Sequence, residues 1–207
     1  MTAVAVIAKE CVPGRVKTRL QPEFTAEEAA LIAAAALADT LRVVSHLPAS
    51  RRILYWAGTQ TPDEARGWEV RHQSTGGLDE RIADLFDAID QPLLLLGMDT
   101  PQVDASWLQG IFRPWGDVDA WFGPATDGGF WALALRKPDG ALIRGIEMSS
   151  ARTGRLQLER LTRAGLRVEE LPPLTDIDTA GDVPAAAQGA PSLAETLRLL
   201  RPDDVTV

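Results

Sequence analysis

A short loop near the start of the sequence gathers residue types that bind phosphate. Gly14, Arg15, Lys17 and Arg19 fall within residues 14–20, in the loop that follows the short apolar run at residues 3–8. Backbone N–H groups at a glycine, a lysine ammonium and arginine guanidinium groups can all point at one polyanion. We therefore expect these four residues to bind the phosphates of a ligand, and we expect Lys17 to take part in catalysis.

Three acidic residues in two later loops have the chemistry of divalent-cation ligands. Asp99 follows the most apolar run of the chain, whereas Asp176 and Asp178 stand two apart, which puts both side chains on one face of an extended segment. Carboxylate oxygens suit Mg²⁺ or Mn²⁺. All three are thus predicted metal ligands, and Asp99 is also a predicted catalytic residue. The alternatives are an Asx turn or helix cap at Asp99 and a helix cap at the Asp-x-Asp pair.

The segment at residues 126–129 has two interpretations. Asp127 followed by Gly128 is a strong turn signal, so the segment can be a hairpin turn. Adjacent glycines also let a sugar approach the backbone, in which case Thr126, Gly128 and Gly129 bind substrate and Asp127 is the candidate base for an acceptor hydroxyl. Arg81 likewise belongs to a plain helix start or reaches a phosphate or a base edge.

The elements that must position these residues are strands alternating with helices. Short apolar runs predict strands, and amphipathic periodicity predicts helices. The predicted strands are residues 3–8, 52–57, 68–71, 92–97, 120–123, 130–135 and 166–171, and the predicted helices are residues 25–47, 78–89, 103–112, 153–164 and 192–200. This alternation implies a mainly parallel sheet covered on both faces. Ligands of such sheets bind beyond the carboxyl ends of the strands, so we expect the candidate loops to converge there.

Composition limits the classes of partner. The 207 residues suit one domain, and a net charge of −8 argues against a nucleic-acid or anionic-membrane surface as partner. No segment has about 18 unbroken apolar residues, so no membrane span is expected, and no signal-peptide pattern opens the sequence. Cys11 is the single cysteine, which excludes an intramolecular disulfide and fits a reducing cytoplasm. We expect Cys11 to be an unreactive thiol.

Four segments in chain order resemble the motifs of the domain-of-unknown-function 2064 (DUF2064) family. They are residues 14–20, 97–101, 123–130 and 176–179, and the resemblance runs from about residue 4 to 183. Members of the family are often labelled glycosyltransferases. The family is similar to the GT-A, or nucleotide-diphospho-sugar transferase, superfamily and to the 2-phospholactate and phosphoenolpyruvate guanylyltransferases. The resemblance implies an α/β fold, a single-domain GT-A-like three-layer sandwich with a mainly parallel mixed sheet. It assigns about residues 3–183 to the motif-bearing core and about 184–207 to a C-terminal helical tail.

The resemblance also implies roles for individual residues. Lys17 and Arg19 correspond to residues that bind the nucleotide phosphates. Asp99 takes the metal-binding place at the end of the central strand, and Asp176 and Asp178 match the paired metal-binding acids of the guanylyltransferase relatives.

The hairpin segment and two departures from the family pattern concern the substrate pocket. Asp127, Gly128 and Gly129 are implied to line the acceptor or sugar pocket. Asp79 stands where a glycine is expected, and Met148 lies near an expected aromatic residue. Both departures affect the identity of the substrate more than the fold.

The functional expectation is a Mg²⁺- or Mn²⁺-dependent transferase that moves a sugar from a nucleotide-sugar donor to a small-molecule acceptor. The alternative is a nucleotidyltransferase that joins a nucleoside triphosphate to a small phosphate or phosphonate and releases pyrophosphate. A third hypothesis is a non-catalytic nucleotide-binding domain. We expect a monomer or a homodimer in the cytoplasm, without nucleic-acid or membrane partners.

Overall fold

The computed structural model describes residues 1–201, and its centre is a mixed seven-stranded sheet. Its order is β3-β2-β1-β4-β6-β5-β7. The strands are β1 (Ala3–Lys9), β2 (Arg52–Ala57), β3 (Glu69–His72), β4 (Leu93–Leu96), β5 (Ala120–Pro124), β6 (Phe130–Leu135) and β7 (Val168–Glu170). Within the sheet, β6 runs antiparallel to its neighbours β4 and β5, and the other pairs are parallel. The predicted mainly parallel sheet is therefore confirmed.

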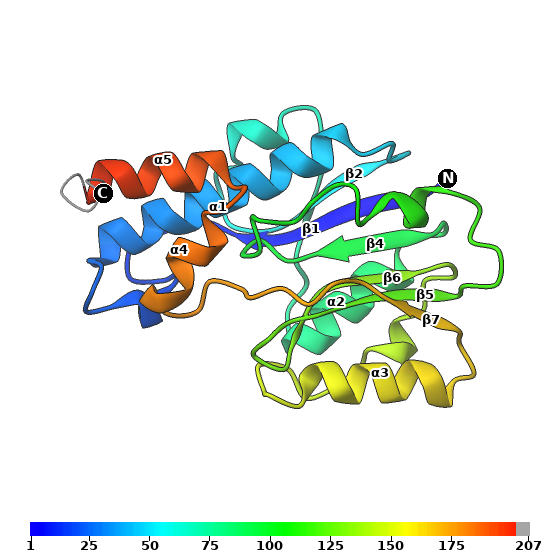
Figure 1. Ribbon diagram of the computed structural model, residues 1–207. Coiled ribbons are helices and arrows are strands. Elements are labelled where there is room, and N and C mark those ends of the chain that lie inside the picture. The colour runs from blue at the N-terminus through cyan, green and yellow to red at the C-terminus, as the bar shows by residue number, and fades with distance from the viewer. Residues whose placement is uncertain (202–207) are drawn as a thin grey trace.

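Helices cover both faces of this sheet and complete three layers. They are α1 (Ala26–His46), α2 (Leu78–Asp87), α3 (Thr153–Arg163), α4 (Val183–Ala186) and α5 (Pro191–Leu200). In Figure 1, α1 and α5 lie on one side of the strands, and α2 and α3 lie on the other. This is the predicted three-layer α/β sandwich (Figure 1).

The inner strands of the sheet are apolar because both sheet faces are covered there, whereas the edge strands β3 and β7 carry charged residues. Along β1, Val4 and Val6 pack with α1 residues in one core, whereas Ala3 and Ala5 pack in a second core with α2 residues such as Phe86. Alternate residues of one strand thus fill two separate cores. A rigid central sheet results, and the loops at its carboxyl end start from fixed positions.

Helix α1 begins as the sequence predicts and forms the centre of its layer. Thr25 Oγ1 accepts the N–H of Glu28 at 3.2 Å, and Glu28 Oε2 accepts the N–H of Thr25 at 2.7 Å, which is a capping box. By length and composition alone α1 could cross a membrane, but 61% of its most apolar window is buried inside the fold. It is the core helix of its layer.

The C-terminal segment packs against α1. Asp39 of α1 is 2% exposed and accepts the N–H groups of Ser192 and Leu193, at 3.0 and 2.9 Å, at the start of α5. These bonds satisfy orphan donors at a helix N-terminus. Residues 184–207 were expected to be a helical tail, and residues 202–207 of it lie outside the described residues.

One predicted helix is wrong. Residues 103–112 form successive turns that end in a 3₁₀ helix at Gln109–Phe112. Asp104 Oδ1 accepts the N–H of Ser106 at 2.7 Å, so its side chain favours a turn over an α-helix. Val103, Leu108 and Ile111 are nevertheless buried in the α1-side core. The apolar spacing that resembled a helix comes from a buried irregular segment.

Candidate functional site

A cavity of about 650 Å³ opens at the carboxyl ends of the parallel strands. Its wall includes Lys9 at the end of β1, Ala57 at the end of β2, and Gly97 directly after β4. This is where ligands of open parallel sheets bind. The charged residues among those that line it are Lys9, Arg19, Arg81, Asp99, Asp127, Asp176 and Asp178.

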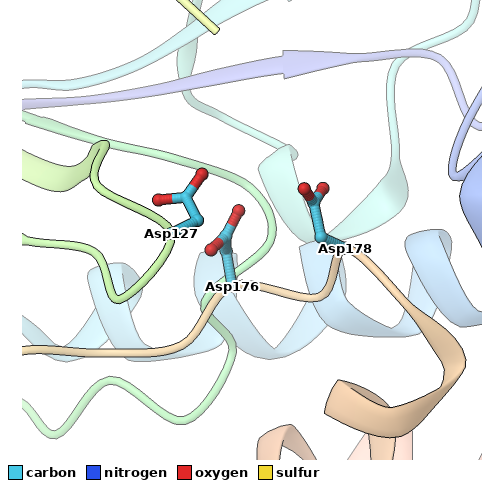
Figure 2. A group of neighbouring side chains, drawn as sticks. All are labelled: Asp127, Asp176 and Asp178. Atoms are coloured by element: carbon cyan, nitrogen blue, oxygen red, sulfur yellow. The ribbon is translucent and has the colours of Figure 1, made fainter. Parts of the chain in front are cut away.

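Three carboxylates meet on one side of this cavity. Asp127 lies in the hairpin between β5 and β6, and Asp176 and Asp178 lie in the loop that follows β7. One oxygen from each carboxylate lies within 4.8 Å of the others. Figure 2 shows the side chains projecting the same way from their two loops, with Asp176 between Asp127 and Asp178. Oxygen ligands in this number and spacing fit a hard divalent cation, Mg²⁺ or Mn²⁺.

The residue between the paired acids explains how both reach the cavity. Ile177 is fully buried in the apolar cluster between α1 and the C-terminal helices. Its N–H donates to the carbonyl oxygen of Asp99 at 3.0 Å, which joins the loop after β7 to the loop after β4. With Ile177 anchored inward, Asp176 and Asp178 both line the cavity.

The crowding of carboxylates changes the acidity of one of them. The pKa of Asp176 is raised to about 6, first because burial disfavours its charge, and then because Asp99, Asp127 and Asp178 add negative charge nearby. A bound cation would reverse this electrostatic cost. The acidic group therefore fits a cation on electrostatic grounds as well as by its ligand type.

Lys17 holds Asp99 in place beside this group. Lys17 Nζ lies 2.8 Å from Asp99 Oδ2 and also donates to the carbonyl oxygen of Ile177. Its backbone is left-handed, with φ of 47°, at the start of a 3₁₀ turn at Thr18–Leu20. Two of the three predicted catalytic residues, Lys17 and Asp99, are thus paired. The third, Asp127, predicted as the base, lies within the group of metal-ligating geometry.

The phosphate-binding loop reaches the cavity through Arg19. Arg19 Nη1 lies 2.7 Å from Asp178 Oδ2, and Arg19 lines the cavity. Gly14 adopts φ of +73° in the turn, and Arg15 is exposed and accepts a hydrogen bond from Lys9 Nζ through its carbonyl oxygen. Neither Gly14 nor Arg15 is among the described residues that line the cavity. The loop thus places the Arg19 guanidinium group on the cavity wall, while the Lys17 ammonium group joins Asp99 to the loop after β7.

The segment at residues 126–129 is the hairpin turn that the Asp-Gly pair predicted. Asp127 Oδ1 accepts the N–H of Gly129 at 2.7 Å, which closes the turn and leaves the rest of the carboxylate toward the cavity. Gly128 has φ of +91°, and a Cβ there would lie 2.1 Å from the carbonyl oxygen of Ala151. In this structure Gly128 permits close approach of another backbone segment, whereas Gly129 lines the cavity.

Thr126 connects the two acidic loops rather than facing the cavity. Its Oγ1 lies 3.0 Å from Thr175 Oγ1, and its N–H donates to the carbonyl oxygen of Leu174. Thr175 directly precedes Asp176. This contact fixes the hairpin against the loop after β7.

Arg81 lines the cavity from the first turns of α2. Its Nη1 donates to Gln73 Oε1 at 2.7 Å, and Gln73 Nε2 donates to the carbonyl oxygens of Ala8 and Tyr55 at 2.9 and 3.0 Å. Sequence reasoning did not select Gln73. Its position directly after β3 was the available signal, because residues that follow a strand face the cavity.

Residues from the segment before α3 and from the first position of that helix also line the cavity and were not predicted. Ser149, Ser150 and Thr153 supply hydroxyl groups there, next to Met148. Asp79, which stands where the family pattern has a glycine, accepts the N–H of Gly145 at 2.8 Å and so joins α2 to the loop before this segment. Met148 thus lines the cavity itself, whereas Asp79 acts through its contact with Gly145.

Cys11 has the properties expected of an unreactive thiol. It is partly buried, and burial raises its pKa to about 11. The thiolate, which is the nucleophilic form, is therefore scarce near neutral pH.

Comparisons with known proteins agree with this fold and give a family. The family model described as "Uncharacterized protein conserved in bacteria (DUF2064)" matches residues 31–150. No curated protein matches the sequence.

Solved structures share the fold at low sequence identity. A protein from Desulfovibrio desulfuricans G20, described provisionally as a nucleotide-diphospho-sugar transferase, has a TM-score of 0.80 at 24% identity, with 98% of this chain and 95% of that chain covered. The CMP:2-keto-3-deoxy-manno-octonic acid synthetase, complexed with CTP, has a TM-score of 0.53 at 12% identity, covering 99% of each chain. Rv0371C from Mycobacterium tuberculosis H37Rv, in complex with manganese, has a TM-score of 0.55 at 20% identity, covering 90% of this chain and 97% of that chain.

Proposed function

The chain belongs to the DUF2064 family, and we propose that it is a metal-dependent transferase that takes a sugar from a nucleoside diphosphate donor and passes it to a small-molecule acceptor. The observation that carries this proposal is the three-acid group of Asp127, Asp176 and Asp178 on the wall of the strand-end cavity, with Arg19 beside it. A cation site next to an arginine suits a diphosphate.

Each charged side chain of the site has a separate role in this proposal. Asp127, Asp176 and Asp178 hold Mg²⁺ or Mn²⁺, which when bound neutralises the donor phosphates and the charge on the departing diphosphate. Arg19 adds hydrogen-bond donors for a phosphate. Lys17 holds the loop that carries Asp99 against the loop at residues 176–178. Asp127 is the exposed acid of the group and is the candidate for orienting an acceptor hydroxyl.

The ion pair of Lys17 supports a diphosphate donor in particular. Its side chain is 10% exposed and is bound to Asp99 and to a carbonyl oxygen. It is therefore not free to neutralise a third phosphate. Arg19 and a divalent cation supply enough positive charge for two phosphates.

Nucleotidyl transfer is the second candidate, because Lys9 and Arg81 line the cavity together with Arg19. Three cationic side chains can neutralise a triphosphate. In that reaction a small phosphate or phosphonate attacks the α-phosphorus, and pyrophosphate leaves. Neither reaction needs a covalent intermediate, since both are driven by positioning and charge stabilisation.

The test compares metal-dependent turnover of the two donor classes. The protein is incubated with a panel of sugar nucleotides and of nucleoside triphosphates, with Mn²⁺ and with chelator. Slow, Mn²⁺-dependent release of nucleoside diphosphate from a sugar nucleotide supports glycosyl transfer, whereas pyrophosphate release with a phosphorylated acceptor supports the second candidate.

Two variants tie the result to this cavity. Asp178→Asn is expected to lose the Mn²⁺-dependent turnover. Asp63→Asn changes an acid that is 90% exposed and is not one of the lining residues, and it should turn over the donor as the wild type does. If the wild-type protein binds neither Mn²⁺ nor any nucleotide of the panel, the proposal is wrong.

A further inference from the structure

The two cationic side chains that meet the acidic loops are held in different ways. Lys17 is 10% exposed and has two oxygen partners, Asp99 Oδ2 and the carbonyl of Ile177. The Arg19 side chain is 72% exposed and, within residues 1–201, pairs with a single carboxylate oxygen, Asp178 Oδ2, at 2.7 Å. Moving the Lys17 side chain would leave Asp99 and the carbonyl oxygen of Ile177 without their donor. The exposed Arg19 side chain can move at little cost in packing.

The partner of Arg19 is itself one of the three acids that fit a cation. The guanidinium group occupies an oxygen of Asp178 and supplies positive charge beside the group. A divalent cation bound to Asp127, Asp176 and Asp178 competes with Arg19 for that carboxylate and repels its charge. Metal binding and the Arg19–Asp178 ion pair therefore oppose each other.

We propose that Arg19 is a transferable cation, which metal binding releases from Asp178 and which then binds the donor phosphates. This inference rests on the proposed function of the site. The geometry allows the transfer because Arg19 already lines the cavity in which the phosphates are placed. One exposed ion pair is exchanged for another, so the movement itself costs little.

The transfer couples metal and phosphate binding beyond any direct contact between them. Metal makes Arg19 available to phosphate, and phosphate removes the competitor of metal at Asp178. Such coupling is reciprocal, since each ligand must raise the affinity for the other by the same factor. A guanidinium group that served only as a fixed phosphate contact would leave metal affinity unchanged when it is removed.

The experiment measures two affinities in Arg19→Gln and asks whether they change in opposite directions. Mn²⁺ binding is measured without nucleotide by calorimetry, and nucleoside diphosphate binding is measured at saturating Mn²⁺. Arg19→Gln is expected to bind Mn²⁺ about threefold to fivefold more tightly, the size of an exposed ion pair. It should bind the nucleoside diphosphate about tenfold more weakly, because a charge-assisted phosphate contact is lost.

Arg15→Gln is the matched control for charge. It removes the same charge from the same loop, at a residue that makes no ion pair with a carboxylate in the described part of the chain. It should leave Mn²⁺ affinity within twofold of wild type. Equal tightening in both variants would show a general charge effect and would overturn the transfer.

The remaining outcomes separate this inference from the proposed function. If wild type binds Mn²⁺ and a nucleoside diphosphate, but Arg19→Gln leaves Mn²⁺ affinity within twofold, the transfer is wrong and the proposed function stands. If wild type binds neither ligand, both are wrong.

A measurement on the wild-type protein covers the case in which Arg19→Gln does not fold. The side-chain Nε–H signal of Arg19, assigned by its loss in Arg19→Lys, is followed by NMR. Mg²⁺ alone should shift it, and a nucleoside diphosphate should shift it again. An unmoved signal on Mg²⁺ binding would overturn the transfer.

Discussion

Lys17 Nζ and Asp99 Oδ2 lie 2.8 Å apart although 82 residues separate them in the sequence. The same ammonium group donates to the carbonyl oxygen of Ile177, so one side chain joins the loops after β1, β4 and β7. These loops carry Lys17 and Arg19 and three of the four acids that line the cavity, Asp99, Asp176 and Asp178. The pair therefore connects the stability of the fold to the geometry of the cavity.

Lys17→Met is expected to destabilise the protein by about 1 to 2 kcal/mol, because it leaves a half-buried carboxylate and a carbonyl oxygen without their donor. Asp99→Asn added to it should restore part of the loss, since the unpaired charge is then gone. The double-mutant cycle is measured by urea unfolding.

The control for this cycle is the exposed pair of Arg66 and Asp63, whose side chains are 82% and 90% exposed. Arg66→Met should change the free energy of unfolding by less than about 0.5 kcal/mol. Additive effects of Lys17→Met and Asp99→Asn would contradict the expected coupling of the buried pair.

Metal affinity should depend on pH through Asp176, whose pKa is about 6. A carboxylate must lose its proton to bind a cation, so Mn²⁺ affinity is constant well above pH 6 and falls below it. For one competing proton the loss at pH 5 is about tenfold relative to pH 8. Calorimetric titration at several pH values checks this, and an affinity independent of pH between 5 and 8 would show that Asp176 is not a ligand.

The same raised pKa predicts that the charged Asp176 carboxylate lowers the free energy of unfolding of the metal-free protein. An acid whose pKa is higher in the folded state binds more protons there, so its contribution to stability falls as pH rises from about 4 to about 6 and stays low above that. Asp176→Asn removes this cost. Without metal it should be more stable than wild type at pH 8 by on the order of 1 kcal/mol, after allowance for solvent screening.

The comparison at low pH is the control for Asp176→Asn. Near pH 4 wild-type Asp176 is itself neutral, so the two proteins should unfold at the same urea concentration. Saturating Mn²⁺ at pH 8 should reverse the order, because it stabilises only the protein that binds it. A variant less stable than wild type at pH 8 without metal would contradict the electrostatic account.

The sequence predicted most of the sheet, because buried strands and their ends have local signals. The bounds of β2 and β6 match the predicted residues 52–57 and 130–135, and the capping box at Thr25 places the start of α1. The strand-end rule then brought the correct loops to one cavity. Residues 103–112 were mistaken for a helix because burial, and not helical structure, sets their apolar spacing.

The partners of individual acids could not be predicted from the sequence. Asp99 and Asp127 both follow strands and both carry a carboxylate, so their types do not distinguish them. Their difference comes from the left-handed turn at Lys17, which directs its ammonium group to Asp99, and from the hairpin that carries Asp127 toward Asp176. These are tertiary relationships without a local pattern.

The close approach of the Ala151 backbone to Gly128 holds the hairpin against the segment before α3. Its φ of +91° strains any other residue, and a Cβ would lie 2.1 Å from the carbonyl oxygen of Ala151. Gly128→Ala should therefore cost the backbone strain of about 1 kcal/mol plus the displacement of the segment before α3, about 3 kcal/mol in total. Because Asp127 is adjacent, Mn²⁺ affinity should fall as well.

Gly165→Ala is the control that isolates the backbone strain. Gly165 has φ of +77°, and a Cβ added there would meet no atom within 4 Å. Equal losses in urea unfolding for the two variants would show that the approach of Ala151 does not restrain the hairpin.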